Sequence, residues 1–142
     1  MKKINFIEWD LEYLVDVPEI DRQHKELMNL LNDAIHHSSG NMIEERTFFD
    51  RRIEMGINFI IKHFEMEEQF LSKTNYEKYN EHKMEHKILL EKIQNIKEEI
   101  ENNKLEIDLS NITSYLTEWL LNHIKVYDKN AKEYFLEGKN KQ

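Results

Sequence analysis

Four segments of the sequence repeat apolar residues at the three- and four-residue spacing of an amphipathic helix. These apolar stripes run through residues 20–35, 49–71, 79–100 and 112–127, with polar breaks between them. Three glycines and one proline in 142 residues leave little of the punctuation that the turns of a β-rich fold need. The pattern therefore predicts an all-α fold: an up-down-up-down antiparallel four-helix bundle, in which each helix turns back along the one before it.

The length of the chain favours one domain, and we expect residues 1–142 to form it. Residues 1–17 lack helical periodicity and predict an ordered N-terminal arm. Residues 18–128 hold the four stripes and predict the bundle itself. Residues 129–142 form a polar tail with one apolar cluster at residues 134–136, which predicts a short C-terminal helix.

The formal net charge is −8, and 34% of the residues are charged, with both signs interspersed. An acidic, mixed surface argues against nucleic acid and against an anionic membrane as a partner. No apolar run approaches the roughly 18 to 20 residues of a transmembrane helix, and Asn5, Glu8 and Asp10 interrupt any signal-peptide core. We therefore expect a soluble, cytoplasmic protein. The acidic charge does not decide between monomer and dimer, and a monomer is the favoured expectation.

Titratable residues fall on the apolar stripes, where burial makes them expensive unless they are paired. The six that share this placement are His24, His63, Glu67, His82, His86 and His123. Residues four apart on a helix bring their Cβ atoms to about 5–6 Å, near enough to bind one ion or two adjacent ions. Imidazole and carboxylate suit iron, zinc, copper or manganese, and the chain has no cysteine. Six such groups are too many for one zinc ion and predict a two-metal site.

Asp128 is a seventh candidate, five residues after His123. In an ideal α-helix five residues turn the chain by about 500°, which leaves Asp128 about 140° away from His123. A π-bulge would bring both side chains to one site, and such bulges are common at functional sites. We therefore predict a π-bulge, or a loosened final turn, between these two residues.

Other polar residues are expected to lie outside the site. His36 and His37 are predicted to be non-ligands near a helix C-terminus, where their side chains stabilise the helix end. Glu68, beside Glu67, is predicted to lie at the solvated rim.

Four stretches, "IDRQHKEL", "HFEMEE", "HKMEH" and "WLLNHIKVYD", together resemble the hemerythrin family. The shared signature is a lone His, His-x3-Glu, His-x3-His and His-x4-Asp in this order, one on each expected helix. The length and Trp9 resemble the single-domain bacterial branch, bacteriohemerythrin.

The resemblance implies a non-haem di-iron centre that binds dioxygen reversibly, without catalytic turnover as its main task. One iron would be held by His82, His86 and His123. The other would be held by His24 and His63 and would keep one coordination place open. Glu67 and Asp128 would bridge the two irons together with an oxo or hydroxo group.

Reversible binding also requires a dry pocket, because stray protons would leave the irons oxidised. Apolar residues within a turn of a ligand candidate could form its wall, and by resemblance Leu120 is the best candidate for a gate. The set is Leu27, Met28, Phe59, Ile60, Phe64, Trp119, Leu120 and Ile124.

Two other classes of function fit the same residues. A di-iron oxidase, peroxidase or nitric-oxide-handling enzyme would need a proton donor or a substrate channel, and Tyr115 and Tyr127 are the nearest donors in the sequence. A structural dizinc bundle would be colourless and indifferent to oxygen. Among the uses of an oxygen-binding site, carriage or storage is favoured over sensing, which would need a separate redox or signalling partner.

Overall fold

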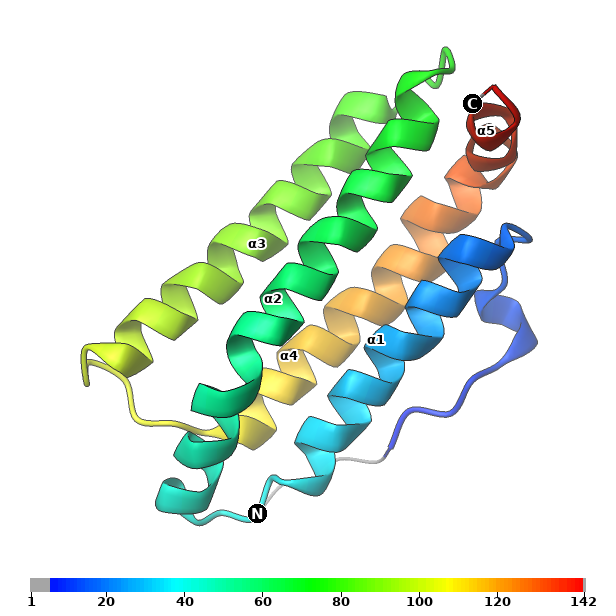
Figure 1. Ribbon diagram of the computed structural model, residues 1–142. Coiled ribbons are helices and arrows are strands. Elements are labelled where there is room, and N and C mark those ends of the chain that lie inside the picture. The colour runs from blue at the N-terminus through cyan, green and yellow to red at the C-terminus, as the bar shows by residue number, and fades with distance from the viewer. Residues whose placement is uncertain (1–5, 142) are drawn as a thin grey trace.

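Four long helices lie side by side and alternate in direction along the chain (Figure 1). The computed structural model describes residues 6–141. The helices are α1 (Pro18–His36), α2 (Met42–Ser72), α3 (Tyr79–Glu101) and α4 (Leu109–Asn122). This arrangement confirms the predicted all-α, antiparallel four-helix bundle.

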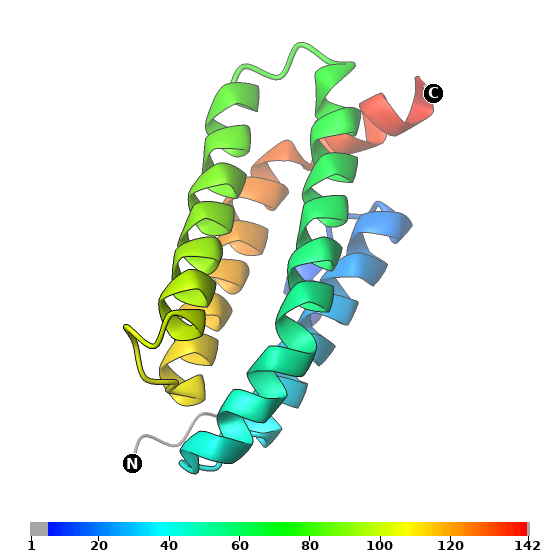
Figure 2. The same ribbon diagram turned by 60° about the vertical axis from the view of Figure 1, so that its left-hand side comes forward.

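The fourth helix does not stop at Asn122. It continues through a π-helical turn, η2 (His123–Asp128), into a final helix, α5 (Lys129–Asn140). Figure 2 shows that α5 turns away from the direction of α4 at the end of the bundle. The predicted short C-terminal helix is therefore confirmed, and no loop separates it from the bundle.

Local sequence explains where the helices begin. Pro18 is the first residue of α1, a position where its missing N–H is no loss. Asn41 precedes α2, and its side chain accepts hydrogen bonds from the N–H groups of Ile43 and Glu44, both at 3.0 Å. Asp108 caps α4 by accepting from the N–H of Asn111 at 3.2 Å. Such caps satisfy backbone donors that the first turn of a helix leaves free.

A buried glutamate joins the two loops at the far end of the bundle from α5. Glu45 is 3% exposed, and its carboxylate accepts from the N–H of Gly40 at 2.6 Å and from the N–H of Leu109 at 2.7 Å. Gly40 has a φ of 81°, a conformation that suits glycine. The bonds hold the start of α4 against the turn between α1 and α2.

The described part of the N-terminal arm runs along the outer side of α1 (Figure 1). Its only helical piece within residues 6–17 is a 3-10 turn at Leu11–Tyr13. The N–H of Ile7 donates to the side-chain oxygen of Asn32 at 2.7 Å, and the Asn32 amide donates back to the Ile7 carbonyl at 2.9 Å. Tyr13 is buried against an apolar cluster that includes Leu27 and Leu120. The first five residues of the predicted arm, and Gln142 of the predicted tail, lie outside the described residues.

The final helix packs on the C-terminal part of α2. Ala131 and Phe135 are fully buried with Phe70 and Leu71 in one apolar cluster. Gly138 lies so close to Phe70 that an added Cβ would overlap the Phe70 carbonyl. The helix therefore covers the end of the bundle nearest to residues 63–67. Among the helices of residues 6–141, none combines the length and the apolar content that a membrane crossing requires.

Candidate metal centre

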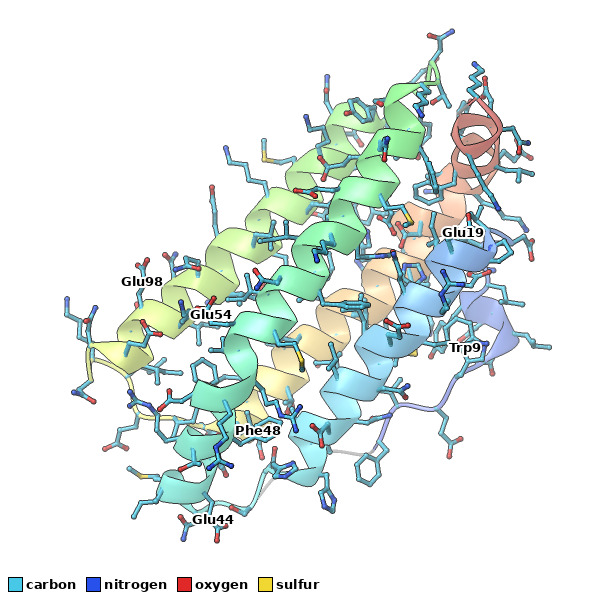
Figure 3. The ribbon with its side chains drawn as sticks, viewed as in Figure 1. Trp9, Glu19, Glu44, Phe48, Glu54 and Glu98 are labelled. Atoms are coloured by element: carbon cyan, nitrogen blue, oxygen red, sulfur yellow. The ribbon has the colours of Figure 1, made fainter. Side chains whose placement is uncertain are left out.

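All seven predicted ligand residues lie together inside the bundle. Each is no more than 1% exposed, and together they come from α1, α2, α3 and η2. The antiparallel order explains the convergence, because it brings the first half of α1 and α3 level with the second half of α2 and the end of α4. The site residues are His24, His63, Glu67, His82, His86, His123 and Asp128. Glu54 and Glu98, by contrast, point away from the bundle interior, as Figure 3 shows.

The histidines fall into two groups with Glu67 between them. Its Oε2 atom lies 2.9 Å from Nε2 of His63 and 3.3 Å from Nε2 of His24. Its Oε1 atom lies 3.0 Å from Nε2 of His86 and 3.2 Å from Nε2 of His82. The two oxygens of one carboxylate are therefore divided between the two groups.

Asp128 repeats this division from the other side. Its Oδ2 atom lies 3.0 Å from Nε2 of His24, and its Oδ1 atom lies 3.1 Å from Nε2 of both His82 and His123. Both carboxylates thus lie between a group of two histidines and a group of three. The donor atoms form two sets, each with all its atoms within 4.8 Å of one another.

The π-helical turn places Asp128 at the site. Residues 123–128 form a π-helix, whose wider turn brings residues five apart onto one face. An α-helix would leave Asp128 about 140° away from His123. The π-bulge predicted from the spacing of these two residues is confirmed.

The chemistry of the cluster fits cations. Within residues 6–141, Nε2 of His63 and both oxygens of Asp128, all of which face the middle of the cluster, are buried without a well-directed hydrogen-bond partner. The Nε2 atoms of His86 and His123 lie 3.1 Å apart, and two ring nitrogens this close cannot both carry a proton. Burying nitrogen and oxygen atoms without a partner costs free energy. Two divalent ions of the kinds that imidazole and carboxylate coordinate would supply the missing partners.

In the metal-free cluster, protons on the histidines balance the negative charge of the two carboxylates. Burial lowers the pKa of His24, but the adjacent Asp128 and Glu67 carboxylates outweigh it and raise the pKa to about 9. Burial likewise lowers the pKa of His82, and the same two carboxylates outweigh it and raise this pKa to about 10. Burial works to raise the pKa of Glu67, yet the adjacent imidazoles of His63, His123 and His24 hold this pKa well below its usual range. Positive ions can replace these protons when the imidazoles turn neutral.

Two further residues contact the ligand candidates, and neither contact was predicted from the sequence. Gln23 places Oε1 at 2.6 Å from Nδ1 of His63. Glu68 places Oε2 at 2.8 Å from Nδ1 of His86. The prediction that Glu68 is a solvated rim residue is therefore wrong in part: its side chain is 25% exposed but reaches α3 to contact a histidine of the centre.

Aromatic rings hold several of these imidazoles in place. The ring of Phe64 stacks on His86 with centroids 3.8 Å apart and planes 4° apart. Trp119 stacks on His123 at 4.6 Å, and Tyr127 lies parallel to the same imidazole at 5.6 Å. An imidazole packed against another ring can rotate little, so the nitrogens of His86 and His123 keep a fixed orientation.

An apolar cavity of about 140 Å³ runs through the bundle beside the cluster. Five of the eight predicted pocket residues line it: Leu27, Ile60, Phe64, Trp119 and Leu120. The other three, Met28, Phe59 and Ile124, do not line it and pack in the cluster around Tyr13 instead. Gly56 also lies on the wall, and a Cβ added there would meet no atom within 4 Å.

His36 and His37 lie apart from the centre, at the end of α1. Both are exposed, and Nδ1 of His37 lies 2.9 Å from the carbonyl oxygen of Asp33. This placement agrees with their prediction as non-ligands.

Comparison with known proteins finds relatives over most of the chain. The family described as the Hemerythrin HHE cation binding domain matches residues 15–134. Bacteriohemerythrin of Methylococcus capsulatus is 25% identical over 118 residues, which are 83% of this chain and 87% of that protein. A hemerythrin-like protein of Naegleria gruberi is 29% identical over 126 residues, 87% of this chain and 89% of that protein. Hemerythrin of Phascolopsis gouldii is 27% identical over 125 residues, with the same two coverages.

A solved structure agrees with these relatives in fold. The crystal structure of a leucine-to-phenylalanine mutant of another protein superposes with a TM-score of 0.80 at 22% identity. The superposition covers 93% of this chain and 98% of that one. At this identity the likeness supports the arrangement of the helices alone.

Proposed function

The chain belongs to the Hemerythrin HHE cation binding domain family, and from that premise we propose that it binds dioxygen reversibly at a non-haem di-iron centre. Membership confirms the resemblance read from the four sequence motifs. A hemerythrin domain implies a di-iron centre, and the buried His, Glu and Asp cluster supplies a donor set that fits one.

One observation carries the proposal: Glu67 and Asp128 each divide two oxygens between two groups of histidines. A carboxylate placed in this way is suited to bridge two metal ions. In the proposed centre His82, His86 and His123 hold one ion, and His24 and His63 hold the other. The second group has one imidazole fewer, so an ion held there would keep a place for dioxygen.

The iron pair would supply the electrons that dioxygen takes up on binding and returns on release. The chain's own contribution is a set of donors with little negative charge, five imidazoles against two carboxylates. Di-iron carboxylate proteins of the ferritin-like kind use Glu-x-x-His motifs on two helices, and this sequence contains none. The donor set therefore favours reversible binding over the oxidation of a substrate.

The cavity supports the same function because its wall beside the histidines is apolar. Its residues there are Leu27, Ile60, Phe64, Trp119 and Leu120. Leu27 and Ile60 lie one turn from His24 and His63, in the group with the open place. A small apolar gas can occupy such a space, while water finds few partners in it.

A di-iron oxidase or peroxidase, or a nitric-oxide-handling enzyme, is the second candidate, and it would need a proton donor at the open ion. Within residues 6–141, neither Tyr115 nor Tyr127 lines the cavity. Tyr127 lies flat against His123 instead, in the group of three histidines. The observation favours binding over turnover.

Carriage or storage is the proposed use of the site, ahead of sensing. Every ligand candidate lies in a packed helix or in η2, and none lies in a loop that could order or disorder on binding. Hydrogen exchange of the iron-loaded protein with and without dioxygen tests this choice. A carrier or store predicts local protection changes around the centre, whereas a sensor predicts changes that extend to the protein surface.

The proposed function itself is tested by gas uptake. Iron-loaded, reduced protein should take up one dioxygen per two irons in an oxygen electrode and return it when the solution is purged with argon. Uptake that cannot be reversed would favour the oxidase.

A further inference from the structure

Two of the five central histidines have a side-chain partner at the ring nitrogen that faces away from the cluster, and the partners differ in charge. Nδ1 of His86 lies 2.8 Å from a carboxylate oxygen of Glu68. Nδ1 of His63 lies 2.6 Å from the amide oxygen of Gln23. Each oxygen can accept a hydrogen bond from Nδ1–H, and the tautomer with this bond is the one whose Nε2 lone pair is available to a cation at the centre.

The charge of the acceptor matters to the imidazole. A carboxylate that accepts from Nδ1–H pulls the proton more strongly than a neutral amide does, and it raises the electron density that Nε2 offers to a cation. Glu68 therefore makes His86 the stronger donor. The amide of Gln23 orients His63 without adding charge.

The ring of His86 is held so that this bond is maintained. Phe64 stacks on its face with planes 4° apart, and Glu68 holds its edge. Glu67 and Glu68 are neighbours on α2, and they approach the same imidazole from its two nitrogens: Oε1 of Glu67 lies 3.0 Å from Nε2. A rotation of the ring would break both contacts.

The two sides of the cluster are thus unequal. The side with His82, His86 and His123 has three imidazoles and the adjacent Glu68 carboxylate. The side with His24 and His63 has two imidazoles and the neutral Gln23. Glu67 and Asp128 serve both sides and do not distinguish them.

We propose that Glu68 is a positioning residue that makes the His82/His86/His123 position bind a divalent transition-metal ion more tightly than its neighbour, so that it fills first. The proposal rests on the proposed two-metal centre and adds an order of loading to it. The ion with the open coordination place would then bind second, at the weaker position, after the first ion is in place.

Titration of the metal-free full chain with Zn²⁺ tests the order, with a chromophoric chelator as competitor. Zinc is used because its binding is measured without oxygen chemistry. We expect two equivalents to bind with unequal affinity. With ¹⁵N-labelled histidine, the first equivalent should shift the ring signals of His82, His86 and His123 and leave those of His24 and His63 unchanged.

Substitution separates charge from shape. Glu68→Gln keeps an acceptor of the same size, and we expect it to weaken the first equivalent by about 10- to 100-fold while the melting temperature of the metal-free protein stays the same. Glu65→Gln is the matched control, because Glu65 is an exposed glutamate on the same helix, and it should change neither affinity. Gln23→Glu should strengthen the second equivalent.

The outcomes are distinct. Wild-type protein that fails to bind two zinc ions would overturn the two-metal centre and this inference with it. Two zinc ions bound with an unchanged first affinity in Glu68→Gln would leave the centre intact and overturn the inference alone. An equal loss in Glu68→Gln and Glu65→Gln would also overturn it, because the cause would then be overall charge. A shift of the His24 and His63 ring signals with the first zinc equivalent would show the reverse order and would contradict the inference.

Discussion

Oδ1 of Asp128 lies 3.1 Å from Nε2 of His123, although the two residues are five positions apart on one helix. The π-helical turn between them makes this approach possible. The same turn lets the Oδ2 atom of Asp128 reach His24 on α1. Asp128 therefore joins two helices at the centre of the bundle.

Replacement of Asp128 should reduce the metal content. Asp128→Ala removes one of two carboxylates that lie between the histidine groups, so we expect iron or zinc to fall from about two ions per chain toward one. Elemental analysis of the purified protein measures the ratio. Asp50→Ala, at an exposed position on α2, is the control and should keep two ions. Full metal content in Asp128→Ala would contradict a bridging role.

The two helical glycines Gly56 and Gly138 should respond in opposite ways to alanine. At Gly138 a methyl group would overlap the Phe70 carbonyl, so Gly138→Ala should lower the free energy of unfolding by about 1–3 kcal/mol. At Gly56 the methyl meets open space, so Gly56→Ala should raise it by about 0.5–1 kcal/mol. Urea denaturation of both variants measures the difference. An unchanged Gly138→Ala protein would show that α5 does not pack as described.

A polar group on the cavity wall should make oxygen binding less reversible. Leu120→Asn gives water a hydrogen-bond partner beside the histidines, and we expect the irons to become permanently oxidised several times faster. Repeated cycles of oxygen and argon, followed by visible absorption, measure the loss. Leu121→Asn is the matched control, because Leu121 is outside the cavity wall. Equal losses in both variants would show that the cavity is not the dry pocket.

The stability of the metal-free protein should depend on pH with a maximum in the mildly acidic range. The folded pKa values of His24 and His82 are about 9 and about 10, above the ordinary value of 6.5, so their contribution is fully present below pH 6.5 and is lost as the pH rises toward 10. The pKa of Glu67 is lowered from 4.5, so its contribution is lost as the pH falls below that value. Burial lowers the pKa of His63 and offsets part of the alkaline loss.

Urea denaturation of metal-free protein at pH of about 5.5 and about 9.5 measures this effect. We expect the free energy of unfolding to be lower at the alkaline pH by about 2 kcal/mol. The zinc-loaded protein is the control, since its imidazoles are already neutral and should show no such loss. Higher stability of the metal-free protein at the alkaline pH would contradict the charge balance described for the cluster.

Much of the centre could be predicted because its ligand candidates obey helical spacing. His63 and Glu67 are four residues apart, as are His82 and His86, and each pair falls on an apolar stripe. Even the departure from spacing at Asp128 was informative, because a shared site required a π-bulge or a loosened final turn, and the structure has the π-helical turn.

The contacts of Gln23 and Glu68 could not be predicted in this way. Both residues reach a histidine on another helix, so the contact depends on how far each helix is rotated about its axis and on the side-chain rotamers. Neither quantity is visible in the spacing of one chain. The shape of the cavity was missed in part for the same reason, since Met28 and Phe59 lie near the ligand candidates in sequence but fill other space.

Visible absorption of the reduced, iron-loaded protein tests the central claim most directly. Spectra are taken without oxygen, after oxygen is admitted, and after the solution is purged with argon. Reversible binding predicts a new band that appears with oxygen and disappears with argon over repeated cycles. A permanent change to the oxidised spectrum on first contact with oxygen would contradict it, and so would an iron-loaded protein whose spectrum does not respond to oxygen.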